Sequence, residues 1–244
     1  MYYRRNTEYR KVGSILIFTF WEGDMPAYIK LCMQTWKHDY TMLTYDNLSK
    51  YTDIPIDKLD KFTLPQIADI VRVHVLRDNG GYWLDADTIM LTDELPTENM
   101  MGFVEERTNT IGYLHTEAHS KMFEEWAKYQ DNIIDSADLD ITPLAWDIVG
   151  NRFTDPYVLN HREISICDVS NKWAETYMVH DFTSRYDKYR YFYFNQFYSL
   201  KKLKPTNMLM LHNSWTPKWY KELDVEAVLK RDCTLSNILR EVTE

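Results

Sequence analysis

One short segment constrains the fold more than any other part of the sequence: Asn79-Gly80-Gly81-Tyr82-Trp83-Leu84-Asp85-Ala86-Asp87. The two glycines supply the positive φ angles that end a helix, and the apolar residues after them are typical of a strand. Because side chains two positions apart on an extended segment share a face, we expect Asp85 and Asp87 to converge at the end of that strand. In open α/β sheets this edge is where ligands bind.

Two carboxylates in this position indicate a site for a hard divalent cation. Magnesium and manganese prefer oxygen ligands, and they often take one or two carboxylates and complete their coordination with water and phosphate oxygens. Asp85 and Asp87 therefore predict a site for a metal ion and a diphosphate. An ordinary turn or helix cap remains the alternative, because Asp-x-Asp also occurs by chance.

The segments around this motif predict an α/β fold. Residues 14–21 are almost continuously apolar and rich in β-formers, as expected for a strand buried on both faces of a parallel sheet. Pro26 is placed to open a helix, and residues 40–45 predict a second strand, which completes a β-α-β unit. A stronger helix begins at Pro65 and ends at Asn79-Gly80.

Later segments give weaker signals. We expect helices at residues 121–129 and 143–149 and a strand at residues 163–169. A late strand at residues 208–211 delivers His212-Asn213-Ser214-Trp215 to its end, and residues 224–242 predict one amphipathic helix. No internal repeat, low-complexity tract or linker is present, so we expect a single domain over residues 1–244.

Asp69 and Arg72 are three positions apart on the second helix and lie off its apolar stripe, so they are neighbours on another face. An exposed ion pair of little energetic value is one interpretation. A polar pair directed at a ligand is the other.

Charge and cysteine content exclude some classes of protein. The formal net charge of −9 argues against a nonspecific nucleic-acid binder, since such proteins carry a basic surplus. Residues 1–11 form a basic, aromatic tail that could contact an anionic membrane surface or stay solvated. Three widely spaced cysteines fit a reducing compartment, and the apolar run at residues 12–21 is too short to span a bilayer. We therefore expect a cytoplasmic protein, either free or peripheral to the inner face of the membrane.

Four segments together resemble the glycosyltransferases of the Asp-x-Asp sugar-binding group. They are Trp21-Glu22-Gly23, Ala68-Asp69-Ile70-Val71-Arg72, the double-glycine segment ending at Asp87, and His212-Asn213-Ser214-Trp215. The nearest likeness is to the capsular polysaccharide synthesis branch, which is related to yeast initiating mannosyltransferases and clostridial glucosylating toxins. It implies a GT-A fold, Rossmann-like, with a mostly parallel central sheet and flanking helices.

The resemblance also implies roles for individual residues. Asp87 is similar to the family's direct metal ligand, His212 to a third protein ligand, and Asp85 to the acid that binds the donor ribose or reaches the metal through water. Further positions match residues that hold the nucleotide sugar: Asp69 and Arg72 at the sugar hydroxyls, Trp83 beside them, Trp21 stacked on uracil, and Ser214 and Trp215 near the departing phosphate.

The implied function is a metal-dependent, retaining hexosyltransferase that uses Mn²⁺ or Mg²⁺. UDP-galactose or UDP-glucose is the expected donor, and the expected acceptor is a bacterial surface polysaccharide, either free or lipid-linked. Residues 12–100 would form the donor-binding half, and residues 101–244 the acceptor side with the C-terminal metal ligand.

Two other functions stay open. Haloacid-dehalogenase-like phosphatases also place an Asp-x-Asp after an apolar strand, and the many aromatic residues would suit a nonenzymatic carbohydrate-binding protein. A glycosidase fits poorly, because its two carboxylates must flank a sugar ring from opposite sides.

Overall fold

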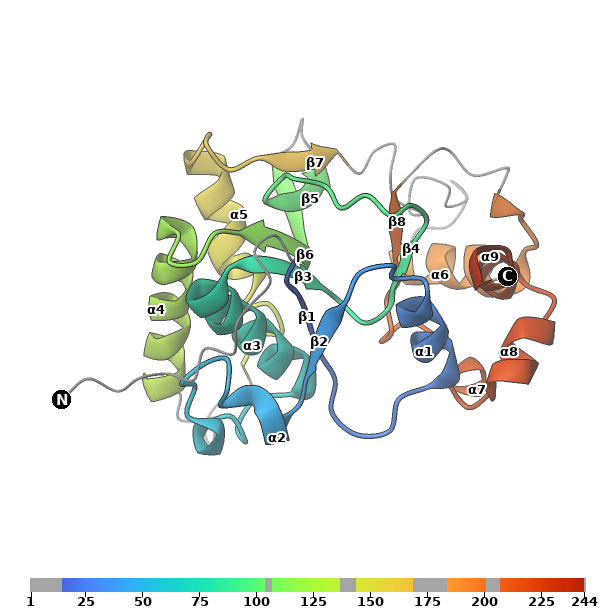
Figure 1. The fold of residues 1–244 in the computed structure, drawn as a ribbon, viewed down its shortest axis with the longest axis horizontal. Coiled ribbons are helices and arrows are strands. Elements are labelled where there is room, and N and C mark those ends of the chain that lie inside the picture. The colour runs from blue at the N-terminus through green and yellow to red at the C-terminus, as the bar shows by residue number, and fades with distance from the viewer. Residues whose placement is uncertain (1–14, 104–106, 137–143, 169–183, 201–206, 244) are drawn as a thin grey trace.

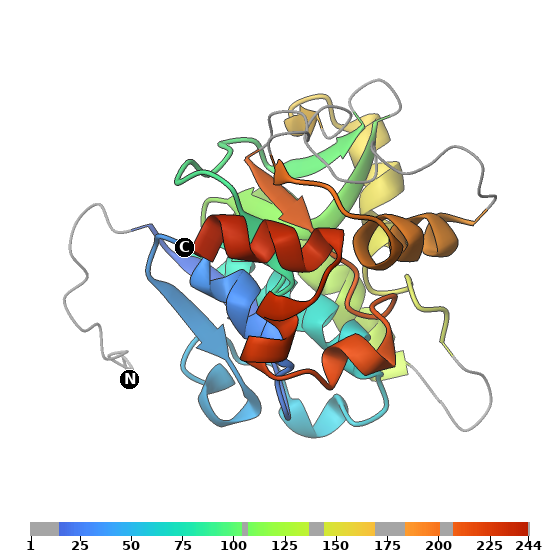
Figure 2. The same cartoon turned by 90° about the vertical axis from the view of Figure 1, so that its right-hand side faces the viewer.

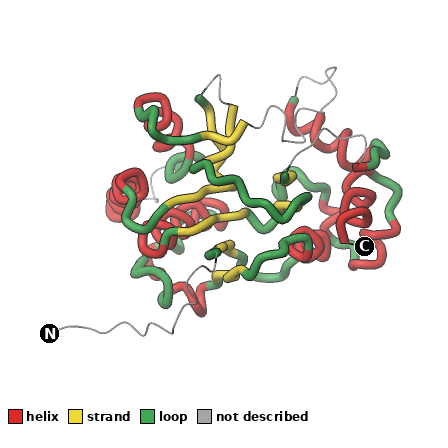
Figure 3. The backbone as a smooth tube through the Cα atoms, turned by 45° about the horizontal axis from the view of Figure 1, so that its top comes forward, coloured by secondary structure: helices red, strands yellow, loops and turns green. Residues whose placement is uncertain are grey.

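A computed structural model describes residues 15–103, 107–136, 144–168, 184–200 and 207–243. Its centre is a six-stranded sheet in the order β2-β1-β3-β6-β5-β7. The pairs β1–β2, β1–β3 and β5–β7 are parallel, whereas β6 runs antiparallel to both β3 and β5. Helices lie on both sides of the strands (Figure 3). The predicted α/β class with a mostly parallel central sheet is therefore confirmed.

The predicted β-α-β unit is present at the start of the described chain. It consists of β1 (Ile17–Phe20), α1 (Ala27–Gln34) and β2 (Tyr40–Leu43). Along β1 the side chains alternate between two apolar clusters, with Ile17 in the cluster beside α1 and Phe18 in the cluster beside α3. Both faces of this strand are thus buried, as expected for a strand in a parallel sheet.

The long helix α3 (Leu64–Asn79) has well-defined ends. Thr63 and Gln66 form a capping box at its start, and the chain leaves it through Gly80 (φ 65°) and Gly81 (φ 94°). A Cβ at Gly81 would lie 2.6 Å from the backbone oxygen of Leu16, so only glycine fits there without a shift. This turn places β3 (Gly81–Leu84) beside β1 and directs the following acids to the edge of the sheet.

A separate two-stranded ladder joins distant parts of the chain. It pairs β4 (Thr88–Met90) with β8 (Met208–Met210) in antiparallel fashion. The ladder continues one step further, because the backbone N–H of Leu211 donates to the backbone oxygen of Asp87 at 3.1 Å. The late strand was predicted, but its pairing outside the main sheet was not.

Helices form a layer on each side of the strands. On one side lie α3, α4 (Lys121–Ser136) and α5 (Asn151–Asn160), and α3 contacts β1, β3 and β6. On the other side lie α1, α8 (Val225–Lys230) and α9 (Thr234–Thr243), and Figure 2 shows α9 across α1. The shorter elements are α2 (Tyr45–Leu48), η1 (Ile56–Lys58), α6 (Arg185–Arg190), the π-helix η3 (Tyr191–Asn195) and α7 (Lys218–Lys221).

Several weaker predictions were wrong in detail. Residues 146–150 form a turn instead of the predicted helix, since the backbone oxygen of Val149 accepts hydrogen bonds from Trp126 Nε1 and Gln130 Nε2. Helix α5 begins only after Gly150. The expected helix at residues 224–242 is divided into α8 and α9, because Arg231 adopts an extended conformation (ψ 135°).

Three more strands complete the sheet: β5 (Met100–Phe103), β6 (Thr108–Thr116) and β7 (Ile166–Asp168). The first two were not predicted, whereas β7 lies within the predicted strand at residues 163–169. All three cysteines are buried, and no disulfide joins any two of them. No described helix has the length and apolar character needed to traverse a bilayer, and the basic tail at residues 1–11 lies outside the described residues.

Candidate functional site

Asp85 and Asp87 lie at the end of β3, but not on an extended segment as expected. Residues 86 and 87 form a turn between β3 and β4, in which the backbone N–H of Thr88 donates to the backbone oxygen of Asp85 at 3.0 Å. The backbone N–H of Asp85 is held by the backbone oxygen of Gly112 at 2.9 Å. The two carboxyl groups are nevertheless close enough for the charge of Asp85 to raise the pKa of Asp87. The turn, not strand alternation, brings them together.

Asp87 is a buried carboxyl group beside the late histidine. Asp87 is only 8% exposed, and its Oδ2 accepts a hydrogen bond from the backbone N–H of Asn213 at 2.7 Å. Burial raises the pKa of Asp87 most, and Asp85 raises it further, whereas the charge of His212 and the Asn213 hydrogen bond lower it. The β4–β8 ladder thus joins the predicted ligands Asp87 and His212.

His212 is held by aromatic neighbours. Its backbone N–H donates to the hydroxyl of Tyr189 at 3.2 Å, and its ring lies 4.0 Å from the ring of Trp215, centroid to centroid. The side chain of His212 is half-buried, so one part of the imidazole remains accessible. These contacts therefore hold the segment His212-Asn213-Ser214-Trp215 in place beside Asp87.

Arg72 is the centre of a buried polar cluster. Its guanidinium forms ion pairs with Asp69 at 2.8 Å and Asp85 at 3.2 Å and lies 5.1 Å from the centroid of the Trp83 ring. Trp83 Nε1 in turn donates to Asp85 Oδ1 at 2.8 Å. Because Arg72 is only 4% exposed, the interpretation of Asp69 and Arg72 as an exposed ion pair is wrong. The structure instead brings four predicted site residues together.

Two glycines make room for these acids, and sequence reasoning did not find them. A Cβ at Gly112 would lie 2.8 Å from Asp85 Oδ2, and a Cβ at Gly150 would lie 3.0 Å from Asp69 Oδ2. Each glycine allows backbone to approach a carboxylate closely. No local signal marks them, since β6 and the turn before α5 were not predicted.

The remaining predicted residues lie around this cluster. Trp21 follows β1, is half-buried, and its buried Nε1 has no hydrogen-bond partner within the described residues. Trp215 is half-buried, and its backbone oxygen accepts from Arg190 Nε at 2.9 Å. Ser214 is exposed.

Tyr28 and Asn213 form a supporting layer that the sequence did not reveal. The hydroxyl of Tyr28, on α1, donates to Asn213 Oδ1 at 2.6 Å, and Tyr28 is fully buried. Asn213 therefore links helix α1 to the Asp87 carboxyl group through its side chain and its backbone. This arrangement fixes the orientation of Asp87 before any ligand binds.

The chemistry of these groups fits a divalent cation. Two neighbouring carboxyl groups, one of them deeply buried with a raised pKa, gain stabilisation from a bound dication, and an imidazole is a common additional ligand. Within the described ranges, no three His, Cys, Asp or Glu side chains lie close enough together to hold a metal ion by themselves. Metal binding at Asp85, Asp87 and His212 therefore stays a prediction.

The buried acid Asp69 predicts a measurable pH effect. Burial raises the pKa of Asp69 to about 6, although Arg72 lowers it. An unfolded Asp titrates near pH 4, so between about pH 4 and pH 7 the folded state binds more protons than the unfolded state. The free energy of unfolding of the wild type is therefore expected to fall relative to Asp69→Asn as the pH rises through this range. Urea denaturation with a chelator present measures it.

Asp135→Asn supplies a control of opposite sign. The hydrogen bond from Lys58 lowers the pKa of Asp135, so the wild type is expected to gain stability relative to this variant as the pH rises. Equal pH dependence for Asp69→Asn and the wild type would contradict the assignment of Asp69 as a buried acid.

Comparison with known proteins gives one family. The family model described as "Capsular polysaccharide synthesis protein" matches residues 2–232. No curated protein matches the chain significantly. Among solved structures, the apo-form glycosyltransferase GlyE of Streptococcus pneumoniae TIGR4 is similar, with a TM-score of 0.42 and 10% sequence identity over 88% of this chain and 62% of that chain. The chain thus spans less than two thirds of that protein, and so low a likeness supports no conclusion about activity.

Proposed function

Because the chain belongs to the capsular polysaccharide synthesis protein family, we propose that it is a metal-dependent, retaining glycosyltransferase. The proposed reaction moves a hexose, galactose or glucose, from a UDP-sugar to a bacterial surface-polysaccharide acceptor that is free or lipid-linked. Mn²⁺ or Mg²⁺ is the proposed cofactor. The resemblance found in four sequence segments is confirmed at the level of the family.

The observation that carries the proposal is the buried Arg72 cluster next to Asp87 and His212. The ion pairs of Arg72 fix Asp69 and Asp85 beside Trp83, and the β4–β8 ladder fixes Asp87 beside His212. Arginine and carboxylate groups held rigidly at the edge of a sheet suit the recognition of sugar hydroxyls and ribose. We assign Asp69, Arg72 and Asp85 to the donor sugar and ribose, with Trp83, only 1% exposed, as the ring that packs on Arg72 and hydrogen-bonds Asp85 on the donor side. We assign Asp87 and His212 to the metal, Trp21 to the uracil, and Ser214 and Trp215 to the departing phosphate.

The proposed reaction exchanges one glycosidic bond for another. The bond between the sugar C1 and the diphosphate oxygen breaks, the acceptor hydroxyl oxygen bonds to C1 on the same face, and the hydroxyl proton passes to the departing UDP or to water. A bound dication would stabilise the negative charge that develops on the departing diphosphate. The protein's own contribution is orientation: Trp83 Nε1 and Arg72 hold Asp85, and Asn213 holds Asp87, so that little reorganisation is needed.

The two alternative functions have less support. In the phosphatase family the nucleophilic acid normally follows the first strand of the domain, whereas Asp85 follows β3 and its Oδ1 already accepts from Trp83 and Arg72. A nonenzymatic carbohydrate-binding protein would not need two neighbouring acids, one of them buried, next to an imidazole. We also propose a cytoplasmic location, for which the supporting observation is that no disulfide joins the three cysteines.

Incubation with a panel of nucleotide sugars tests the proposed function. With Mn²⁺ present, slow hydrolysis of one UDP-sugar to UDP and free hexose is expected even without an acceptor, and mass spectrometry detects both products. Chelation of the metal should abolish the reaction. If no nucleotide sugar is bound or hydrolysed, the glycosyltransferase proposal fails. Binding of free glycan without metal or nucleotide, in the absence of any hydrolysis, would favour the carbohydrate-binding alternative.

A further inference from the structure

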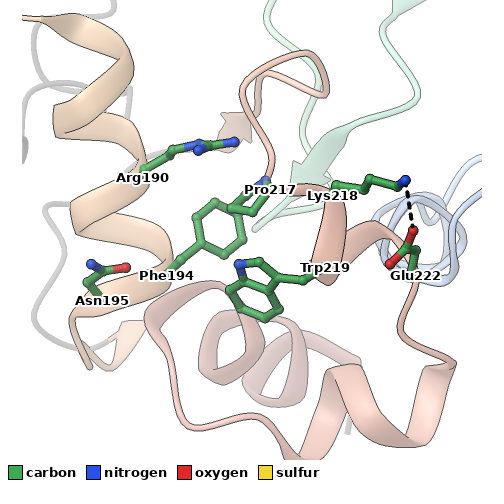
Figure 4. A pocket seen from close by; sticks show the side chains of 7 residues that line it. All are labelled: Arg190, Phe194, Asn195, Pro217, Lys218, Trp219 and Glu222. Carbon is green, nitrogen blue, oxygen red and sulfur yellow. Dashed lines mark ion pairs between the residues drawn. The ribbon is translucent and has the colours of Figure 1, made fainter.

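A cavity of about 680 Å³ lies outside the cluster of predicted site residues, between residues 190–195 and residues 217–222. The residues that line it are Arg190, Phe194, Asn195, Pro217, Lys218, Trp219 and Glu222. Figure 4 shows two sides to this cavity, with Arg190, Phe194 and Asn195 on one segment and Pro217, Lys218, Trp219 and Glu222 on the other. Its volume is in the range of small-molecule sites.

The cavity shares a structural element with the candidate site. Tyr189, at the end of α6, accepts a hydrogen bond from the backbone of His212, and the next residue, Arg190, donates from Nε to the backbone oxygen of Trp215. Arg190 also lines the cavity. The same helical turn therefore contacts the proposed metal-ligand segment and forms a wall of this cavity.

The lining combines a partly exposed aromatic residue with several polar groups. Trp219 is 42% exposed, the guanidinium of Arg231 lies 4.8 Å from its ring centroid, and the ring of Phe194 packs against it in a T-shaped arrangement. Asn195 is exposed beside these rings, and Lys218 forms an ion pair with Glu222 at 3.6 Å. An aromatic surface surrounded by amide, carboxylate and cationic groups suits a ring with one apolar face and several hydroxyls.

We propose that this cavity binds a pyranose ring of the acceptor glycan, with Trp219 as the stacking platform. The inference rests on the proposed function, since it names the acceptor side of the same enzyme. Asn195, Glu222 and Lys218 supply hydrogen-bonding groups for the sugar hydroxyls. The acceptor chain would then extend from this ring past Arg190 toward the His212–Trp215 segment.

Binding of simple glycosides tests the proposal without the need for turnover. The protein is labelled with 5-fluorotryptophan, and among the eight Trp resonances that of Trp219 is identified by its loss in Trp219→Phe. Methyl glycosides of glucose, galactose and glucuronic acid are the probes. At least one is expected to shift the Trp219 resonance saturably, and Trp219→Ala is expected to weaken its binding by about tenfold, as measured by calorimetry.

Matched variants keep the test specific. Tyr40→Ala removes another aromatic side chain of similar exposure, 41%, outside the cavity, and should bind the glycoside like the wild type. If Trp219→Ala does not fold, as judged by its circular dichroism and thermal melt, Asn195→Ala replaces it, with weaker binding expected. The inference is overturned if no glycoside shifts the Trp219 resonance, or if the variant that folds binds the glycoside as tightly as the wild type.

The two proposals fail in different ways. If the wild type hydrolyses a UDP-sugar but no glycoside shifts the Trp219 resonance, only the acceptor cavity is wrong. If it hydrolyses no nucleotide sugar, the glycosyltransferase proposal fails, and the acceptor role fails with it even where a glycoside binds in the cavity.

Discussion

Asp87→Asn is expected to slow UDP-sugar hydrolysis by about 100-fold to 1000-fold while the protein stays folded. Asparagine has nearly the same shape as aspartate, and its amide oxygen can still accept the hydrogen bond from the backbone N–H of Asn213. It lacks the charge that a metal ligand needs. Since burial and Asp85 both disfavour the ionised Asp87, the metal-free variant should melt at the same temperature as the wild type or higher at neutral pH.

Mass spectrometry of UDP release and calorimetry with Mn²⁺ and UDP together measure this effect. Asp135→Asn is the matched control, because Asp135 is an exposed carboxylate paired with Lys58 and should tolerate the same change without loss of activity. Wild-type turnover in Asp87→Asn would remove the metal-ligand assignment. A lowered melting temperature would instead show that the carboxylate itself stabilises the fold.

Arg72→Met should destabilise the protein by about 3–5 kcal/mol. Methionine fills a similar space, but it leaves the mostly buried carboxylate of Asp69 and the partly exposed carboxylate of Asp85 without their shared cation. The contact of the guanidinium with the Trp83 ring is lost as well. Lysine is not an equivalent replacement, because a single ammonium group cannot reproduce the planar, forked contacts of arginine.

Chemical denaturation of Arg72→Met gives the change in the free energy of unfolding. Lys58→Met is the control: Lys58 and Asp135 form an ion pair at 2.8 Å, but their side chains are 48% and 65% exposed. Loss of such a surface pair typically costs about 0–1 kcal/mol. A similar small cost for Arg72→Met would mean that the buried cluster contributes little to stability. In that case the double variant Arg72→Met, Asp69→Asn should have the same free energy of unfolding as Arg72→Met alone.

Residues 12–100, the half proposed to bind the donor, were largely predictable from the sequence because their signals are local. A proline that opens a helix, two glycines that end it and an apolar strand depend on residues near one another in the chain. Asp69, Arg72 and Trp83 were therefore placed on the correct elements. Their shared ion pairs were not foreseen, since helical spacing alone cannot distinguish an exposed pair from a buried one.

The rest of the site depends on contacts between distant segments, which no local pattern encodes. Tyr28 acts through Asn213, and Gly112 and Gly150 matter only because β6 and the turn before α5 pass close to carboxylates. The sequence predicted a helix where the turn before α5 lies. It does not show that the carbonyl of Val149 accepts hydrogen bonds from side chains of α4. In each case tertiary packing overrides what the neighbouring residues favour.

The β4–β8 ladder also has a consequence for the order in which the protein matures. Asp87 and Asn213 are 126 positions apart, so the ladder and the proposed metal-binding residues cannot come together until the ribosome has released residue 213. Until that time Thr88, Ile89 and Met90 present an open, mostly apolar strand edge that can pair with other nascent chains. The candidate site is thus completed late in synthesis, and slow translation of the C-terminal quarter would prolong the period in which the unfinished chain is prone to aggregate.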